Sequence, residues 1–339
     1  MFLGICKYSL RKKTLKKVMS FKCLECNDEF NSERSLHAHL KKHRFSLADY
    51  YQKHHPRKNL LTGTLLQFKS LDTYFTEDFD NREQLLRWCA FEEPETVKLY
   101  VKELLHRRIV EKELKHAPCH LEIETSTLPS IDIYKKLYGS YTAVCKEIGV
   151  DPILNRPLPK DFHNDYSEAT IFVDTREQQP LKFKNEREVK LDFGDYTAGG
   201  SFYTKTFVDR KSESDFKGTL VGENLDRFRR ELERCKQMDS YLFIVVESSL
   251  DKIETNNAFG PHKSNLKFIY HNMRLLLQEF GGYCQFVFSG SRKNSAAIIP
   301  KLLVMGPKLW NVDIQYFIDK DSSWLGSKEN KNEKALIAR

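Results

Sequence analysis

The sequence predicts an α/β fold for the C-terminal half of the chain, preceded by a small ββα unit and a mainly helical middle region. Short apolar runs typical of buried strands, IFVD, YLFIVVE and CQFVFSG, alternate with segments of helical periodicity. The clearest helices are LDRFRRELERC and LKFIYHNMRLLLQEF, and the second ends at the pair Gly281 and Gly282. This alternation indicates a sheet flanked by helices, with YLFIVVE as a buried parallel strand.

Composition and motifs divide the chain into five segments. Pro152, Pro157 and Pro159 indicate a stiff linker ahead of the α/β domain. The segments we expect are a basic tail over 1–18, the ββα unit over 19–45, a helical DNA-binding or linker region over 46–160, the α/β domain over 168–306 and a C-terminal tail over 307–339. The polar, charged end of that last tail is expected to be disordered.

The overall composition fits a multidomain protein that works inside the cell. The chain of 339 residues is long enough for two or three domains. It carries 55 Lys and Arg against 47 Asp and Glu, and the resulting charge of +8 suits a polyanionic partner without proving one. Its eight cysteines have no framework spacing, which favours a reducing, intracellular compartment, the nucleus if the source is eukaryotic. No apolar run is long enough to span a membrane.

The first eighteen residues contain many lysines and no acid. This pattern fits a phosphate-binding arm or an organelle transit peptide. A simpler interpretation, which we prefer, is that Met19 is the true start and that the segment is a disordered tail or a translation artefact.

Two cysteines and two histidines near the N-terminus have the spacing of a zinc finger. Two residues separate Cys23 from Cys26, three separate His39 from His43, and twelve lie between the pairs. Tetrahedral Zn2+ is satisfied by two thiolates from a hairpin and two imidazoles one helical turn apart. Because so small a unit has almost no core, the metal would supply most of its folding free energy. A single finger reads only about three base pairs, so both DNA and protein remain open as its partner, and we interpret His37 as a surface residue.

The middle region contains a helix-turn-helix pattern. LPSIDIYKKLYGSYTAVCKEIGVDP predicts two helices joined by a turn at Gly139. It resembles the short DNA-binding repeats that accompany phage and homing endonucleases. A small helical packing unit with Tyr134, Tyr141 and Val144 in its core fits the pattern equally well.

A long helix is expected ahead of that pattern. PETVKLYVKELLHRRIVEKELKH opens on Pro94 and continues with good helix formers, and its mixed charges favour a helix exposed to solvent. His116, Cys119 and His120 follow, but no fourth ligand stands at a suitable spacing, so a second metal site is not expected.

An aspartate and an acid-any-lysine triplet form the skeleton of a metal-dependent hydrolytic site. Residues two apart on a strand share a face, so Asp209 and Lys211 point one way and Arg210 points the other. Asp195 follows Gly194, which allows a tight turn that brings a second carboxylate beside the first. Two carboxylates with Mg2+, and a lysine that orients water or neutralises a phosphate, can hydrolyse a phosphodiester.

Further acidic motifs surround this skeleton. The strand in IFVDTREQQPL ends at Val173 and leads into Asp174, Arg176 and Glu177. Downstream, Asp215 stands ahead of the helix LDRFRREL. Taken in order, VDTREQ, LDFGDY, VDRKSESDF and LDRFRREL resemble the nuclease domain of the XPF family of structure-specific endonucleases, over about residues 170 to 305.

The resemblance implies a restriction-endonuclease-like α/β fold, with Mg2+ or Mn2+ as cofactor. It also implies cleavage of branched or flapped DNA at the junction between duplex and single strand. The family pattern, GD, then ERK, then an aspartate, falls on Asp195, on Asp209, Arg210 and Lys211, and on Asp215. The chain departs from the pattern at Asp209, where the family has glutamate. This shorter acid would hold the metal closer to the strand or bind it through a water.

Each candidate residue then has an expected role. Asp195 and Asp209 are the expected magnesium ligands, and Arg210 and Arg227 are the expected DNA contacts, with plain surface charge as the alternative for Arg227. For Glu247, at the end of YLFIVVE, a solvated position and a role in the site remain equally open. The supporting residues are Lys211, which orients water, Glu177, which binds metal or water, and Asp174, Arg176 and Asp215, which brace the site through hydrogen bonds.

These features predict a Mg2+-dependent DNA endonuclease that acts on branched, flapped or forked DNA, in repair, recombination or mobile-element processing. The alternatives are a non-catalytic DNA-binding module that keeps the nuclease fold as a scaffold, and a zinc-finger adaptor. The intact set of acids favours the enzyme. The last residues carry no tandem helix-hairpin-helix signature, so dimerisation through such a module is not expected. Pairing through the nuclease domain, with a second copy or a partner subunit, remains open.

Overall fold

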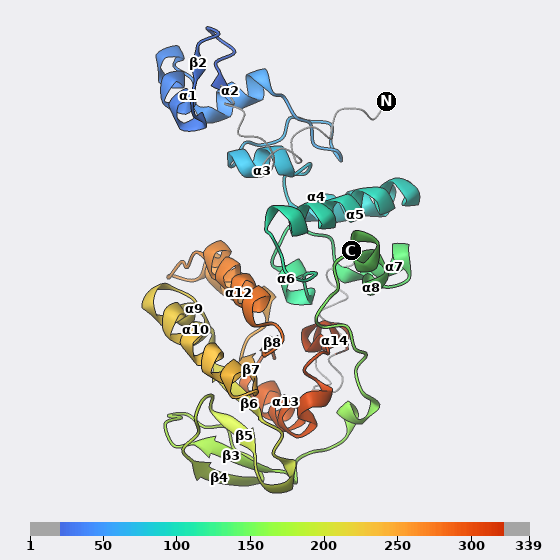
Figure 1. Cartoon of the computed structure of the whole chain (residues 1–339), viewed down its shortest axis with the longest axis vertical. Helices are drawn as coiled ribbons and strands as arrows, with labels where there is room; N and C mark the ends of the chain where they lie inside the picture. The colour runs from blue at the N-terminus through green and yellow to red at the C-terminus, as the bar shows by residue number, and fades with distance from the viewer. Residues whose placement is uncertain (1–20, 322–339) are drawn as a thin grey trace. The chain divides into compact units, whose positions relative to one another are not determined.

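The computed structural model describes residues 21–321, and these residues form two units (Figure 1). The expected basic tail over 1–18 and the polar end of the expected C-terminal tail lie outside the described residues. One unit contains the described residues up to Arg108 together with Thr127–Gly139, and the other contains Ile109–Ser126 and the chain from Ser140 onward. The chain therefore passes from one unit to the other three times.

The second unit is built on a six-stranded mixed sheet. Its strands are β3 (Thr170–Asp174), β4 (Asn185–Val189), β5 (Tyr196–Ala198), β6 (Thr206–Lys211), β7 (Tyr241–Val246) and β8 (Cys284–Phe288), in the order β4-β3-β5-β6-β7-β8. β7 pairs in parallel with β6 and β8, while β5 runs antiparallel to β3 and β6. All six residues of β7 are buried, which confirms the expected buried parallel strand.

Helices cover both faces of this sheet (Figure 1). One face packs against α9 (Glu213–Thr219), α10 (Gly222–Gln237), α11 (Leu250–Phe259) and α12 (Leu266–Phe280). The other face packs against α13 (Arg292–Met305) and α14 (Ile314–Lys320). The unit is completed by α6 (His120–Glu124), α8 (Tyr141–Ile148) and the 3-10 turns Lys160–His163, Gly200–Phe202 and Gly306–Lys308. The predicted mixed α/β class with a central sheet is therefore confirmed.

The first unit combines a short hairpin with helices. Its elements are β1 (Phe21–Lys22), β2 (Glu29–Phe30), α1 (Glu33–His39), the 3-10 turn Leu40–His43, α2 (Leu47–His54), α3 (Leu71–Thr76), α4 (Arg82–Phe91), most of α5 (Pro94–Glu111) and α7 (Ile131–Tyr138). β1 pairs antiparallel with β2, and α1 follows directly, which is the ββα order expected near the N-terminus. Gly139, with a φ of 78°, stands between α7 and α8 where a turn was predicted.

Helix α5 differs from the sequence-based prediction in its burial. The helix forms over Pro94–Glu111, but it is not simply exposed. Val97, Val101, Leu105 and Ile109 are buried, at intervals of four residues. Such spacing gives a helix one apolar face, so the expectation of a fully solvated helix was wrong. The many charges between these positions obscured the stripe.

The predicted proline-rich linker is packed against the sheet unit. The Arg156 amide donates to the Asn311 carbonyl at 2.9 Å, and Phe162 is buried among residues of the sheet. On the C-terminal side, Val312 and Ile314 fill the same core, so the structured part of the sheet unit runs past residue 306. The two units thus follow limits different from the expected ones, because long-range contacts place residues 109–126 and 140–160 with the sheet.

Two general properties concern the described residues as a whole. No helix within residues 21–321 is both long and apolar enough to cross a membrane. The cysteines in the same range are all free thiols.

Candidate functional site

Strand β6 places an acid and a lysine on the face covered by α10. Asp209 and Lys211 point to this side, and the Lys211 Nζ lies 2.8 Å from Asp209 Oδ2. The same ammonium lies 5.2 Å from the centre of the Phe228 ring on α10. The alternation of side chains along a strand therefore places Asp209 and Lys211 side by side in one partly buried ion pair.

A glycine turn brings Asp195 beside this pair. Gly194 has a φ of 68°, and a Cβ there would lie 2.9 Å from the Val208 carbonyl oxygen of β6. Only glycine fits so close a backbone approach at positive φ. The Asp195 amide donates to that Val208 carbonyl at 2.7 Å, and the Arg210 amide donates to Asp195 Oδ2 at 2.7 Å. The turn thus fixes the Asp195 carboxylate against the backbone of β6.

A further acid, Glu231 on α10, joins the site and was missed from the sequence. Its Oε1 accepts a hydrogen bond from the Gly194 amide at 3.1 Å. A signal was available, because Glu231 lies three residues after Phe228 and four before Cys235, which are both buried. The helical period therefore places Glu231 on the face of α10 that packs on the sheet.

Crowding of these carboxylates changes their protonation. Burial, followed by the charge of Asp209, raises the pKa of Asp195 to about 8. The same two causes raise the pKa of Glu231 above its ordinary range. Burial disfavours the ammonium of Lys211, but the Asp209 carboxylate outweighs it and raises the pKa of Lys211. Three acids thus face one ammonium, and protonation of an acid relieves their mutual repulsion in the metal-free site.

On the opposite face of β6, Arg210 joins two acids. Its Nη2 lies 3.0 Å from Glu177 Oε1, and its Nη1 lies 3.1 Å from Glu247 Oε2. Although burial disfavours its charge, these two carboxylates raise the pKa of Arg210. The Arg210 side chain is only 8% exposed. It holds protein acids in this structure, and its predicted contact with DNA stays a prediction.

Asp174 is fully engaged by its neighbours. Its Oδ1 accepts from the Arg176 amide and Nε at 2.8 and 2.7 Å, and its Oδ2 accepts from Arg176 Nη2 and the Leu191 amide at 2.9 and 2.7 Å. Burial opposes its charge, but these donors outweigh burial and lower the pKa of Asp174. Asp174 and Arg176 therefore tie the end of β3 to the chain ahead of Gly194.

The remaining two candidates lie on the helices beyond β6. Asp215 is exposed, and its carboxylate accepts from the Ser212 hydroxyl at 2.7 Å at the start of α9. The Ser212 side chain caps that helix through the Asp215 amide. Arg227 is exposed on α10. Both residues keep their predicted roles only as predictions.

The use of carboxylate oxygens separates two groups of acids. Among the described residues, the hydrogen bonds and ion pairs given for Asp195, Asp209, Glu177 and Glu231 each involve one carboxylate oxygen. Both oxygens of Asp174 are taken by two donors each. The first group is thus oriented but open to a ligand, whereas Asp174 is a structural brace.

In the first unit, four side chains are arranged to hold a metal ion. The Cys26 Sγ lies 3.1 Å from His39 Nε2, which lies 3.0 Å from His43 Nε2, and together with Cys23 all four ligand atoms fall within 4.8 Å of one another. Two thiolates and two imidazoles form the donor set that Zn2+ prefers. Across residues 21–321, no other three Cys, His, Asp or Glu side chains meet in this way.

This Cys/His group is joined to the helix that follows it. The Tyr50 hydroxyl accepts from the Leu24 amide at 2.9 Å, and the Tyr51 hydroxyl lies 3.0 Å from His37 Nε2. Tyr50 and Tyr51 are both buried with Cys23 in one core. His37, which we interpreted as a surface residue, is partly exposed, and α2 contacts it through Tyr51.

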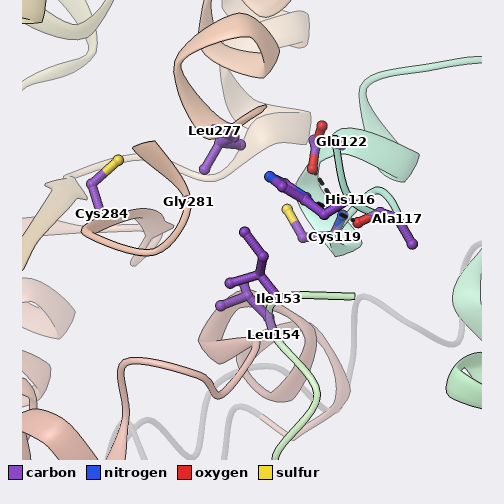
Figure 2. Close-up of a pocket in the computed structure, with 9 residues that line it drawn as sticks. All are labelled: His116, Ala117, Cys119, Glu122, Ile153, Leu154, Leu277, Gly281 and Cys284. Atoms are coloured by element: carbon purple, nitrogen blue, oxygen red, sulfur yellow. Dashed lines mark hydrogen bonds between the residues drawn. The ribbon is translucent and has the colours of Figure 1, made fainter. Parts of the chain in front are cut away.

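His116, Cys119 and His120, considered above as metal ligands, take part in other contacts. Figure 2 shows His116 and Cys119 lining a small cavity with Glu122, opposite Gly281. Gln278 Nε2 donates to Glu122 Oε1 at 2.8 Å, and burial raises the pKa of that acid. His120 instead lies 2.7 Å from Asp319 through its Nε2. These side chains hold α6 to α12 and α14 within the sheet unit.

Comparisons with known proteins give a partial likeness. No family model matches the chain, and no curated protein matches it. Among solved structures, the chain is similar to XPF from Aeropyrum pernix, with 20% identity and a TM-score of 0.32, over 41% of this chain and 67% of that one. It is also similar to XPF from Aeropyrum pernix in complex with DNA, with 21% identity and a TM-score of 0.32, over 42% of this chain and 66% of that one.

Proposed function

We propose that the chain is a metal-dependent DNA endonuclease with a restriction-endonuclease-like catalytic unit. The observation that supports this most is the group of oriented acids around Lys211. Asp195, Asp209 and Glu231 each present one unbonded carboxylate oxygen, and a single ammonium faces them. When all three acids are ionised, they exceed the single ammonium by two negative charges, which equals the charge of one divalent cation, and carboxylate oxygens are the preferred ligands of Mg2+.

The catalytic roles follow from this arrangement. Asp195 and Asp209 would hold Mg2+ or Mn2+. Bound there, the cation would lower the pKa of an attacking water and offset charge on the phosphate. Lys211, anchored to Asp209 and resting on Phe228, orients that water or contacts the scissile phosphate. Asp174 and Arg176 brace the site, and Glu177 binds the metal or a water.

The proposed substrate is DNA with a junction between duplex and single strand. The motifs VDTREQ, LDFGDY and VDRKSESDF support this class through their resemblance to XPF-family nucleases. Repair, recombination and mobile-element processing are the settings in which such junctions arise. Exposed Arg227 is a candidate phosphate contact.

The Cys/His group is proposed to bind Zn2+. Cys23 is fully buried and His39 nearly so, and the four ligand atoms approach one another closely enough for one tetrahedral ion. Metal analysis of protein purified without chelators tests this, with one zinc per chain as the expected result. Protein without zinc would refute it.

A cleavage assay tests the nuclease. Purified protein with Mg2+ or Mn2+ is expected to nick a labelled flap or fork near its junction. Asp195→Asn and Lys211→Ala are expected to lower the rate by a factor on the order of 100 or more, since each removes charge at the reacting phosphate. Asp239→Asn is the matched control, because Asp239 is 83% exposed and away from these acids.

The same assay separates the enzyme from a scaffold. If flaps, forks and plain duplexes all remain uncut with both metals, the nuclease proposal fails. Binding to junction DNA without cleavage would then favour the non-catalytic module.

A further inference from the structure

Four alternating charges form a chain on the face of β6 that lies opposite Asp209. Arg292, the first residue of α13, lies 3.1 Å from Glu247 Oε1 through its Nη1. Glu247 Oε2 lies 3.1 Å from Arg210, and Arg210 lies 3.0 Å from Glu177 Oε1. The four residues come from α13, the end of β7, β6 and the segment after β3.

Burial increases along this row of charged side chains from Arg292 toward Glu177. The side chains of Arg292, Glu247, Arg210 and Glu177 are 44%, 12%, 8% and 8% exposed. The charges balance in number, so the inner pairs can be buried without a net charge. Removal of one inner side chain would leave its partner charged and poorly solvated, which is costly. The four side chains are therefore held in fixed positions relative to one another.

Arg292 also contacts the backbone that follows Glu177. Its Nη2 donates to the Gln179 carbonyl at 2.7 Å and to the Pro180 carbonyl at 3.1 Å. The Gln179 amide in turn donates to Glu177 Oε1 at 2.8 Å. The Gln179 amide and the Arg210 guanidinium thus contact the same oxygen of Glu177.

We propose that Glu247 and Arg292 are positioning residues that hold the Glu177 carboxylate in its working orientation. They act through Arg210 and through the carbonyls at 179 and 180, and neither touches the proposed substrate. Oε1 of Glu177 is the oxygen that both Arg210 and the Gln179 amide contact. This role rests on the proposed nuclease function, and it assigns a purpose to Glu247 that the sequence left open.

The hydrogen bond from the Gln179 amide provides a direct measurement. Hydrogen–deuterium exchange of the peptide containing Gln179 reports whether Glu177 Oε1 stays in place, with or without metal or DNA. Glu247→Gln and Arg292→Met are expected to speed this exchange about tenfold, as loss of a charge-assisted hydrogen bond would. Glu279→Gln is the control, because Glu279 pairs with Arg229 at 3.1 Å on α12 and α10, away from this segment. Unchanged exchange in both test variants would overturn the proposal.

Kinetics with a cleavable junction then separate positioning from simple stability. Glu247→Gln and Arg292→Met are expected to lower kcat about tenfold with little change in KM, because substrate contacts remain intact. Arg292→Lys should recover part of the loss by keeping the charge. Wild-type kcat in both test variants would reject the positioning role. If the wild type cleaves no substrate while both variants still exchange faster at Gln179, the nuclease proposal fails. The proposal that Glu247 and Arg292 position Glu177 is then retained.

Discussion

At the scale of single residues, the two kinds of acid predict opposite mutational outcomes. Asp195→Asn removes a carboxylate whose charge burial disfavours, so the variant should unfold at a temperature no lower than that of the wild type while losing cleavage. Asp174→Asn replaces one acceptor oxygen by an amide nitrogen, so two of the four hydrogen bonds are lost and the free energy of unfolding should fall by roughly 2 kcal/mol, a figure discounted because Arg176 is more than half exposed. Thermal unfolding of both variants checks this. Equal destabilisation by the two substitutions would contradict the assignment of Asp174 as a structural brace and of Asp195 as an acid that is open to a ligand.

The raised pKa of Asp195 also predicts a pH dependence of stability. A carboxyl with a pKa of about 8 in the folded protein, against an ordinary 3.8, favours folding when protonated, and its unfavourable contribution grows as pH rises between these values. Metal-free protein should therefore lose more stability from pH 5 to pH 8 than Asp195→Asn does. Unfolding midpoints at the two pH values measure the difference. Parallel pH profiles for wild type and variant would count against a raised pKa.

Residue roles were predictable where they depend on local geometry. The positive φ of Gly194 and the shared face of Asp209 and Lys211 follow from residue type and strand alternation. Glu231 was missed because LDRFRRELERC was interpreted from its helical periodicity, and among its charged residues only Arg227 was considered for a role. The partners of Arg210 depend on strands that meet only in the folded sheet, so no local pattern indicates them.

At the scale of elements, a buried histidine links α6 to α14. His120 Nε2 lies 2.7 Å from Asp319, and the His120 amide donates to Asp313 at 2.8 Å. Burial opposes the imidazolium, but the hydrogen bond to Asp319 and the charge of Asp313 outweigh it and raise the pKa of His120. The resulting stability is present below the ordinary pKa of 6.5 and is lost as pH rises through the higher folded value.

The test compares the stability of His120→Gln with that of the wild type at a pH below and a pH above the titration of His120. The variant should lower the unfolding midpoint clearly at pH 5.5 and less at pH 9. A destabilisation that is the same at both pH values would show that the imidazole acts only by packing.

The elements around the Cys/His group should respond to metal removal together. Tyr50 and Tyr51 of α2 share a core with Cys23, so loss of the metal should loosen α2 as well as the hairpin. A chelator or Cys26→Ser is expected to speed amide exchange across residues 21–54, while the sheet unit keeps its unfolding midpoint. Cys89→Ser, on α4, is the control. Unchanged protection of α2 after metal loss would show that the helix folds without it.

Helix α1, which carries the two histidines of the Cys/His group, has short side chains at the positions where a zinc finger would read bases. Positions −1, 3 and 6 relative to the start of α1 are Ser32, Ser35 and Ala38. The two serine hydroxyls lie 2.8 Å apart and satisfy each other. Short side chains at these positions favour a structural role for the finger or contact with the DNA backbone.

Whole elements were predicted more accurately than their surroundings. Strands β7 and β8 and helices α10 and α12 form where the periodicity placed them. The buried face of α5 was missed because charged residues separate its apolar positions. The packing of the proline-rich segment depends on Asn311, far along the chain, and such contacts leave no trace in local composition.

At the scale of the whole molecule, the sheet unit needs residues outside the expected domain over 168–306. Leu121, Leu309, Val312 and Ile314 lie outside it and are essentially fully buried in the sheet unit. Their loss would remove roughly 6 kcal/mol or more of apolar burial, comparable to the stability of a typical domain. A 168–306 fragment should lack a cooperative thermal transition that a 109–321 fragment retains. Matching transitions in both fragments would refute this.

The proposed site residues lie close together in the sequence, which affects how the site can be passed between proteins. Every acid assigned to the site, from Asp174 to Glu247, belongs to one uninterrupted stretch between β3 and the end of β7. The Cys/His group and the helices of the first unit contribute none of them. A recombination event that moved this stretch alone would carry the proposed acids but leave behind Arg292 and the core residues from Leu309 to Ile314, so the proposed site can be inherited only together with its flanking segments.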